Sequence, residues 1–235
     1  MLHRRAGDEL VVVGQPAHAL VAGALARAWA GPFAPRDAVC LAAEQHDVGW
    51  TGWELAPELD PATGLPYTFA DLPVPRRLAL WAGAGERLVP QSRYAALLVS
   101  LHGTLLVERF PPPPEHAAIV QAYLARERAF QETLRGSLGA DPVELARNRE
   151  LVFTWDALSL ELVHGVSGSR AVAGFTLSAN GPDVRVAPWP FREAALAVSF
   201  EGRVLGGTFT DEAAMRAALD AAPWVVVETP LRPAT

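Results

Sequence analysis

The sequence predicts an α+β protein: a mainly helical core over residues 1–165, and a small C-terminal β-sheet layer formed by an α+β appendage over residues 166–235. Two observations predict this fold class. Before Gly165, apolar residues recur three and four positions apart over several long segments, which is typical of helices with one buried face. After Gly165, short apolar runs alternate with turn-forming residues, which is typical of β-hairpins. We expect the appendage to pack on the core or to be fused to it.

Composition and charge exclude several classes of protein. Half of the 235 residues are apolar, so a sizeable core is possible. No run approaches the roughly eighteen consecutive apolar residues of a membrane helix, and Met1 to Gly14 does not resemble a signal peptide, so we expect a cytoplasmic protein without a membrane partner. The net charge of −6 argues against a nucleic-acid partner. All 20 basic residues are arginine, which leaves no lysine for catalysis, and the single Cys40 excludes a thiolate metal cluster.

A short apolar strand is predicted over Leu10 to Val13, followed by the first helix. Pro16 stands where a first helical turn accepts proline, and Gly31-Pro32 ends the helix after about Ala30. A histidine belongs to its apolar stripe and therefore points inward. The stripe consists of His18, Val21, Ala22, Leu25, Ala26 and Trp29.

The second predicted helix begins near Pro35 to Asp37 and ends at Gly49, with His46 on its apolar face and Asp47 next to it. Neighbouring helical residues diverge by about 100°, so this pair can reach one ion only at a frayed helix end, which Gly49 supplies. Residues 50–75 then read as a long loop rich in proline and aromatic residues. Loops of this length are often functional lids.

Three further helices are predicted, and two of them carry a polar residue on the apolar face. Residues 91–109 place His102 among leucines, and the helix that opens at Asp141-Pro142 places Asp156 beside Trp155. Residues 115–135 read as an exposed, charged helix.

The C-terminal part is predicted to contain two hairpins, one helix and a closing strand. The first hairpin joins 175–178 to 184–186, and the second joins 196–200 to 204–205 around Glu201-Gly202. A short helix over 211–221 and a strand over 224–227 follow. This sheet is a possible partner for the strand at residues 10–13.

The most informative feature for function is a set of five polar residues on apolar helix faces. They are His18, His46, Asp47, His102 and Asp156. Burying such side chains costs free energy unless each finds a partner, and one metal ion would satisfy all of them. Imidazole and carboxylate ligands without thiolate suit iron, manganese, zinc or nickel. Structural roles without a metal ion remain open for these residues. His102 could be a hydrogen-bonded core residue, His46-Asp47 a helix cap, and Asp156 a hydrogen-bond partner of Ser159.

The order of these residues resembles the HD superfamily of metal-dependent phosphohydrolases and oxygenases, which has a histidine, a His-Asp pair and an aspartate on separate helices. More closely, five segments across nearly the whole chain are similar to the family called domain of unknown function 3891. The segments are Gln15-Pro16-Ala17-His18-Ala19, His46-Asp47-Val48-Gly49-Trp50, Leu97-Leu98-Val99-Ser100-Leu101-His102, Trp155-Asp156-Ala157-Leu158-Ser159-Leu160 and Pro188-Trp189-Pro190-Phe191. This resemblance implies an HD-like helical core with metal between its helices.

The resemblance also implies roles for single residues. His18, His46, Asp47 and Asp156 would be the ligands of a first divalent transition metal ion, and His102 would complete its shell or help to hold a second ion. His102 and Asp47 are the catalytic candidates. The substrate-binding candidates are Gln15, Trp50, Trp53, Tyr94 and Arg93. The lysine that follows the His-Asp pair in several HD enzymes is missing here, which speaks against an anionic substrate, although Arg93 offers a cation for a phosphate.

Three hypotheses for function follow. The first is a metal-dependent hydrolase that uses a metal-bound water on a small phosphoester or ester-like substrate. The second is an iron-dependent HD-type oxygenase, which needs a second ion with its own ligands, so that the positions of His102, His116 and His164 matter. The third is a non-catalytic protein that binds a metal or a ligand. In each case the expected partner is a small molecule, and a homo-oligomer is possible.

Overall fold

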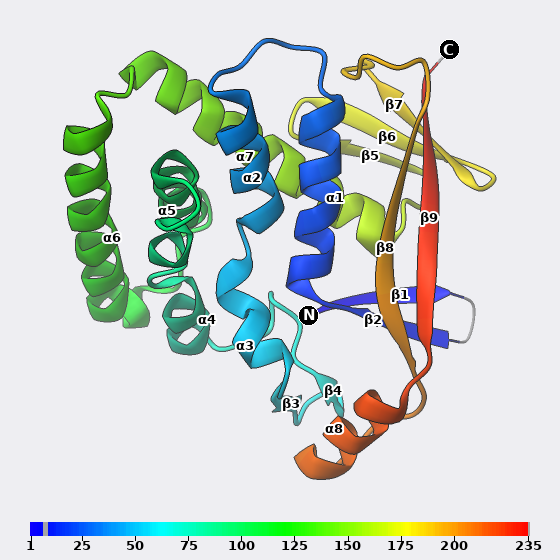
Figure 1. Cartoon of the computed structure of the whole chain (residues 1–235). Helices are drawn as coiled ribbons and strands as arrows, with labels where there is room; N and C mark the ends of the chain where they lie inside the picture. The colour runs from blue at the N-terminus through cyan, green and yellow to red at the C-terminus, as the bar shows by residue number, and fades with distance from the viewer. Residues whose placement is uncertain (7–8, 235) are drawn as a thin grey trace.

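In the computed structural model, which describes residues 1–6 and 9–234, a layer of helices packs against a curled seven-stranded sheet (Figure 1). About half of the residues are helical. The helices are α1 (Gln15–Ala28), α2 (Arg36–Gln45), η1 (Val48–Trp50), α3 (Thr51–Glu54), α4 (Val74–Trp81), η2 (Gly85–Leu88), α5 (Arg93–Arg109), η3 (Pro114–His116), α6 (Ala117–Leu138), α7 (Pro142–His164) and α8 (Glu212–Ala221). The strands are β1 (Leu2–Ala6), β2 (Glu9–Val13), β3 (Leu59–Asp60), β4 (Leu65–Pro66), β5 (Ser169–Val172), β6 (Phe175–Asn180), β7 (Asp183–Ala187), β8 (Leu196–Leu205) and β9 (Trp224–Pro233).

The large sheet combines both ends of the chain, so the prediction of a small C-terminal sheet on a helical core is wrong. Its strand order is β1-β2-β8-β9-β7-β6-β5, and all neighbours are antiparallel except β7 and β9. Strand β2 is buried along Leu10–Val13, and a buried strand needs hydrogen-bonding partners along its edges. β1 supplies one partner and β8 the other, with Leu10 opposite Leu205. The N-terminal strands β1 and β2 thus form one edge of the same curled sheet.

The second predicted hairpin is also wrong, because β8 runs without a turn from Leu196 to Leu205. Gly202, expected in a turn, pairs instead with Val225 in mid-strand. A Cβ atom on Gly202 would lie 2.5 Å from a methyl carbon of Val11. The glycine therefore permits close contact between β8 and β2. The first predicted hairpin is confirmed as the antiparallel pair β6 and β7.

The predicted helices are confirmed, with shifted ends, as α1, α2, α5, α6, α7 and α8. Local signals explain several of the ends. Ser92 and Asp141 accept hydrogen bonds from backbone N–H groups in the first turns of α5 and α7, and Gly139 adopts a left-handed conformation, φ 56°, directly after α6. The predicted loop over residues 50–75 instead contains α3, β3 and β4, and α4 begins within its last residues.

Helices α1, α2, α5 and α7 face one another, and their apolar stripes form the main core with the inner face of the sheet. Trp155 on α7 lies at the centre. Its side chain is fully buried, and its ring makes edge contacts with Trp29 at 5.6 Å and Phe33 at 5.3 Å between centroids. Within the described residues, no helix is both long and apolar enough to cross a lipid bilayer.

Candidate metal centre and adjoining cavity

Four helical segments bring the five predicted polar residues to one point in the helical layer. His18 comes from α1, His46 and Asp47 from the end of α2, His102 from α5 and Asp156 from α7. Each residue is at most 5% exposed. Because His18, His102 and Asp156 sit on apolar faces that converge on the core, packing of the helices brings them together, and the end of α2 adds His46 and Asp47.

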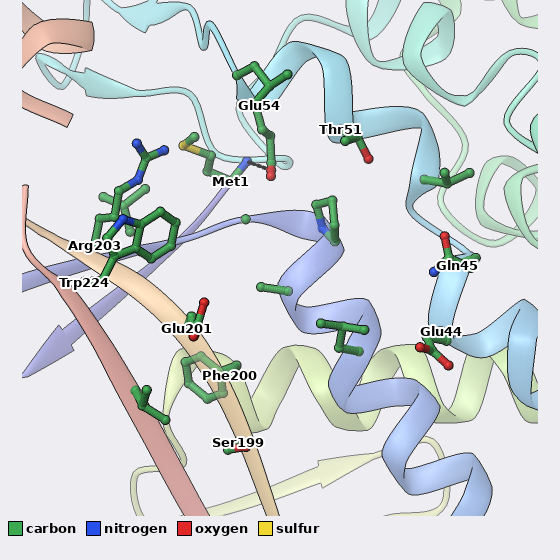
Figure 2. Close-up of a pocket in the computed structure, with 18 of the residues that line it drawn as sticks. Met1, Glu44, Gln45, Thr51, Glu54, Ser199, Phe200, Glu201, Arg203 and Trp224 are labelled. Carbon is green, nitrogen blue, oxygen red and sulfur yellow. Dashed lines mark ion pairs between the residues drawn. The ribbon is translucent and has the colours of Figure 1, made fainter. Parts of the chain in front are cut away.

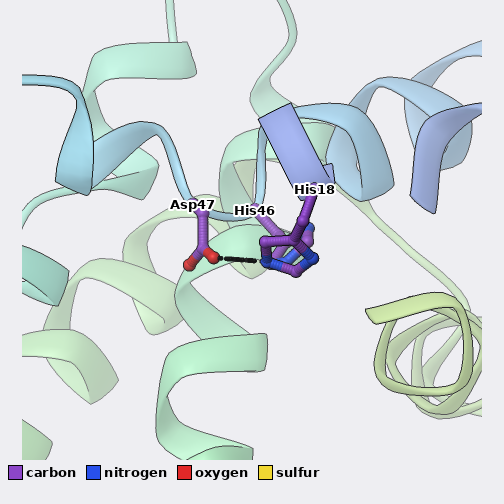
Figure 3. Close-up of side chains that lie close together, drawn as sticks. All are labelled: His18, His46 and Asp47. Carbon is purple, nitrogen blue, oxygen red and sulfur yellow. Dashed lines mark hydrogen bonds and ion pairs between the residues drawn. The ribbon is translucent and has the colours of Figure 1, made fainter. Parts of the chain in front are cut away.

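The side-chain atoms are spaced as ligands around a metal ion would be. Nε2 of His18 lies 2.8 Å from Oδ2 of Asp47 (Figure 3), and Nε2 of His46 lies 3.6 Å from the same oxygen. Asp156 lies between two histidines, with Oδ1 at 3.3 Å from Nε2 of His46 and Oδ2 at 3.4 Å from Nε2 of His102. Two donors bound at about 2.1 Å to one ion are about 3.0 Å apart at right angles and about 3.4 Å apart at tetrahedral angles.

The five residues form two overlapping groups that share His46. One group is His18, His46 and Asp47, and the other is His46, His102 and Asp156; in each, the candidate ligand atoms lie within 4.8 Å of one another. The imidazole of His46 also makes edge contacts with the rings of both other histidines, at 4.9 and 5.0 Å between centroids. His46 is therefore the central residue of the cluster.

The adjacent His46 and Asp47 reach the same point because the helix unwinds between them. His46 still has helical backbone angles, whereas Asp47 has φ −104° and ψ 20° and precedes the tight turn of η1. Gly49 in that turn has a different role from the predicted helix end. A Cβ atom there would collide with the carbonyl oxygen of Leu80, so the glycine allows α4 to pack against the turn.

Hydrogen bonds orient two of the histidines so that Nε2 faces the carboxylates. His46 Nδ1 donates to the carbonyl oxygen of Ala43 at 2.7 Å. The hydroxyl of Ser159 donates to the carbonyl oxygen of Asp156, so its oxygen accepts a hydrogen bond from Nδ1 of His18 at 2.9 Å. With the proton on Nδ1, the Nε2 atom of each imidazole has a lone pair that points at a carboxylate oxygen. A second proton or a cation between these two atoms removes this unfavourable contact. This is the arrangement that positions histidines as metal ligands.

Replacing Ser159 by alanine is expected to weaken metal binding about 10- to 100-fold, because the ring of His18 loses the acceptor that sets its tautomer and orientation. Competition with a chromogenic chelator measures the affinity. Thr154→Ala is the matched control, since its hydroxyl also bonds a backbone carbonyl of α7 but is exposed. Equal affinities for wild type and Ser159→Ala would show that the hydroxyl does not orient a ligand.

The electrostatics of the cluster favour a bound cation. Burial opposes the charged form of His46, but the charges of Asp47 and Asp156 outweigh it and raise the pKa of His46 to about 9. Burial by itself would raise the pKa of Asp156, yet His46 and His102 hold that pKa well below its usual range. Without a metal ion, a proton on His46 therefore balances part of the carboxylate charge, and a divalent cation can take its place.

The hydrogen bonding also fits a metal. Among the described residues, Nε2 of His46 and both ring nitrogens of His102 are buried without a hydrogen-bond partner. Buried polar atoms without a partner are costly in native proteins. Coordination by a metal ion would satisfy the Nε2 atoms, so the residues fit the ion that the sequence predicts.

A cavity of about 360 Å³ adjoins the cluster, and Asp47, His102 and Asp156 form part of its wall. Gln15, a predicted substrate-binding residue, lies on the same wall, and its buried side-chain oxygen has no hydrogen-bond partner among the described residues. The remaining wall is apolar except for Arg77. The apolar residues are Phe69, Ala70, Trp81, Leu106, Val107, Phe110, Pro112, Phe153, Ala157 and Leu160.

The other predicted substrate-binding residues do not line this cavity. Trp50 and Trp53 contact each other at 5.7 Å between centroids and belong to an apolar cluster with Leu10 and Leu205, so they anchor the segment after α2 to the sheet. Arg93 and Tyr94 lie in the first turn of α5, about 12 Å along the helix from His102. Arg93 approaches Ser137 at the surface, and the hydroxyl of Tyr94 bonds Asn148.

Sequence reasoning missed Arg77 and Trp81 because both belong to α4, most of which follows the predicted loop. A usable signal was present: Leu78 and Trp81 are three residues apart, as on one helix face. Phe153 and Leu160 on α7 also lie on the cavity wall; Leu160 belongs to the predicted apolar stripe of this helix, and Phe153 lies outside it.

A larger hollow, about 780 Å³, lies over the start of α1, with strands β8 and β9 on one side and the segment from α2 to α3 on the other (Figure 2). Its wall includes Glu44, Glu54, Glu201 and Arg203, but none of the five clustered residues. Oε1 of Glu54 accepts a hydrogen bond from the backbone N–H of Gln15 at 2.7 Å and so holds the start of α1. Of these two cavities, only the smaller one is lined by residues of the cluster.

Comparison with known proteins supports a family assignment. No curated protein and no solved structure matches the chain significantly. One family model, described as a protein of unknown function (DUF3891), matches residues 1–206, a range that includes all five clustered residues and the cavity wall. Since this range covers most of the chain, the protein belongs to the DUF3891 family.

Proposed function

We propose that this protein is an HD-like, divalent-metal-dependent hydrolase of a small phosphoester or ester-like substrate. The observation that carries the proposal is the cluster of three histidines and two aspartates, buried on four helical segments and spaced as metal ligands, at the wall of a cavity of about 360 Å³. A cavity of this size suits a small organic substrate.

The roles of the ligands follow from the contacts. His18, His46, Asp47 and Asp156 hold the ion, and Ser159 and the Ala43 carbonyl orient the two imidazoles. When bound, a divalent transition metal supplies an activated water and polarises the substrate oxygen. Because the helices pack tightly around the cluster, the ligands are preorganised.

His102 and Asp47 have a second role in the proposal, since both line the cavity. Neither ring nitrogen of His102 has a hydrogen-bond partner among the described residues, so the imidazole is available to donate a proton to the leaving group. The carboxylate of Asp47 is available to accept a proton from the attacking water. Asp156, another of the proposed ligands, lines the same cavity.

An iron-dependent oxygenase is the less favoured alternative. It needs a second ion with its own ligands, and the two candidate groups here share His46. His164 lies near Phe69 and His116 directly precedes α6, and neither joins a candidate metal group in the described chain. The arrangement favours one ion and hydrolysis.

Removing the metal is expected to abolish activity. Protein purified without chelator should contain about one transition-metal ion per chain and should hydrolyse p-nitrophenyl phosphate or p-nitrophenyl acetate. Dialysis against a chelator should stop turnover, and added zinc, manganese, nickel or iron(II) should restore it. Elemental analysis and absorbance assays provide the measurements. A metal-free site that resists reconstitution would favour a non-catalytic protein, and two irons with oxygen uptake would favour the oxygenase.

A further inference from the structure

Among the described residues on the cavity wall, one charged side chain is not part of the metal site, the guanidinium of Arg77. It reaches the wall from α4, on a different segment from any of the five clustered residues. Asp47, His102 and Asp156 line the same cavity. A sphere of about 360 Å³ is about 9 Å across, so one small molecule can contact both ends.

The hydrogen bonds of Arg77 leave part of its donor capacity unused. Nη1 donates to the carbonyl oxygens of Phe69 and Ala70, each at 3.3 Å, whereas Nε is buried without a partner among the described residues. The neighbouring Arg76 is paired with Glu58 at 2.6 Å, but Arg77 forms no ion pair within the described chain. Burial lowers the pKa of Arg77, yet a guanidinium stays charged at neutral pH. Arg77 thus lines the cavity as a cation with no carboxylate at ion-pair distance among the described residues.

The surroundings of Arg77 match an anion with an apolar body. The guanidinium carbon lies 5.7 Å from the centre of the Trp81 ring, and this contact holds the planar group in place. Most of the wall consists of aromatic and aliphatic side chains, among them Phe110, Phe153 and Leu160. Such a wall suits an aryl or alkyl group, and Arg77 is the only arginine on it among the described residues.

We propose that Arg77 binds an oxyanion of the substrate, a phosphate or a carboxylate, while the apolar wall holds an aryl or alkyl body. The statement that the bound anion is a substrate rests on the proposed function, whereas the statement that Arg77 binds an anion does not. Binding of an anion by Arg77 differs from the expectation, drawn from the missing lysine after the His-Asp pair, that speaks against an anionic substrate. The planar fork of an arginine suits both oxyanions, which bind it through two parallel hydrogen bonds.

Calorimetric titration of the protein as purified tests the proposal with three ligands of similar shape: phenylphosphonate, phenylacetate and neutral benzyl alcohol. Arg77→Gln is expected to weaken binding of phenylphosphonate, phenylacetate or both by roughly tenfold or more, and to leave benzyl alcohol unchanged. Arg76→Gln is the matched control and should bind all three like wild type. The relative affinities of the two anions tell phosphate from carboxylate.

Two outcomes overturn the inference: anion affinities within threefold of wild type in Arg77→Gln, or an equal loss for benzyl alcohol, which would indicate a structural role. A measurement on the wild type removes the dependence on folding of the variant. Phenylphosphonate or phenylacetate should protect Arg77, but not Arg76, from phenylglyoxal, as mapped by mass spectrometry, and equal modification with and without ligand would also overturn it. If anion binding depends on Arg77 but the protein has no metal and no turnover, only the proposed hydrolase is contradicted. If Arg77→Gln hydrolyses p-nitrophenyl phosphate as fast as wild type does, only this inference is contradicted.

Discussion

Replacing His46 by alanine is expected to remove the bound metal and to lower phosphoester turnover by roughly a thousandfold or more. The reason is its central position, since the two candidate ligand groups share His46 and its Nε2 faces both aspartates. Its loss leaves neither group complete. Elemental analysis should find less than about a tenth of an ion per chain in the variant. Added metal should raise the melting temperature of the wild type and leave that of the variant unchanged.

His116→Ala is the control for this experiment, because His116 stands at the start of α6 outside the cluster. It should retain both metal and turnover. Unchanged metal content in His46→Ala would show that the cluster is not the metal site. Loss of turnover with full metal content would assign His46 a catalytic role without a role in binding the ion.

Replacing Trp155 by alanine is expected to lower the free energy of unfolding by about 3–5 kcal/mol. The indole is fully buried between Trp29 and Phe33 in the core shared by the helices, so truncation leaves a large cavity. Because Asp156 is the next residue, metal affinity should fall as well. Urea unfolding followed by circular dichroism measures the stability, and chelator competition measures the affinity.

Trp224→Ala is the matched control, since this tryptophan on β9 is 64% exposed and contacts only the guanidinium of Arg203 among the aromatic and cationic groups described. It should change the free energy of unfolding by no more than about 1 kcal/mol. Similar losses in the two variants would mean that Trp155 does not organise the core. A large loss in Trp155→Ala with unchanged metal affinity would separate core stability from the site.

The helices and the clustered residues were accessible from the sequence because both depend on local periodicity. A stripe with three-and-four spacing determines which face of a helix is buried, whatever it packs against. His18, His102 and Asp156 lie on such stripes, so their burial follows from the pattern. Helices that share one core bring their buried polar groups into one place, which explains why these residues meet.

The sheet was not accessible in this way, because strand pairing joins residues distant in the sequence. Residues 201–202 have the composition of a turn, yet pairing with β9 keeps β8 extended through them, and pairing with β2 begins at the next residue, Arg203. No local signal tells a turn glycine from one that admits a neighbouring strand. Gly49 is a similar case, since its role is set by the carbonyl of Leu80 on α4.

By itself, the sequence therefore determined the main helices and the five polar residues that meet between them, because burial of an amphipathic face is a local property. Only the tertiary structure decided the seven-stranded sheet and the cavity wall. It moved Trp50 and Trp53 into an apolar cluster and brought Arg77 to the cavity beside His102. These features depend on which surfaces come into contact, and contacts between distant segments are selected by packing of the whole chain.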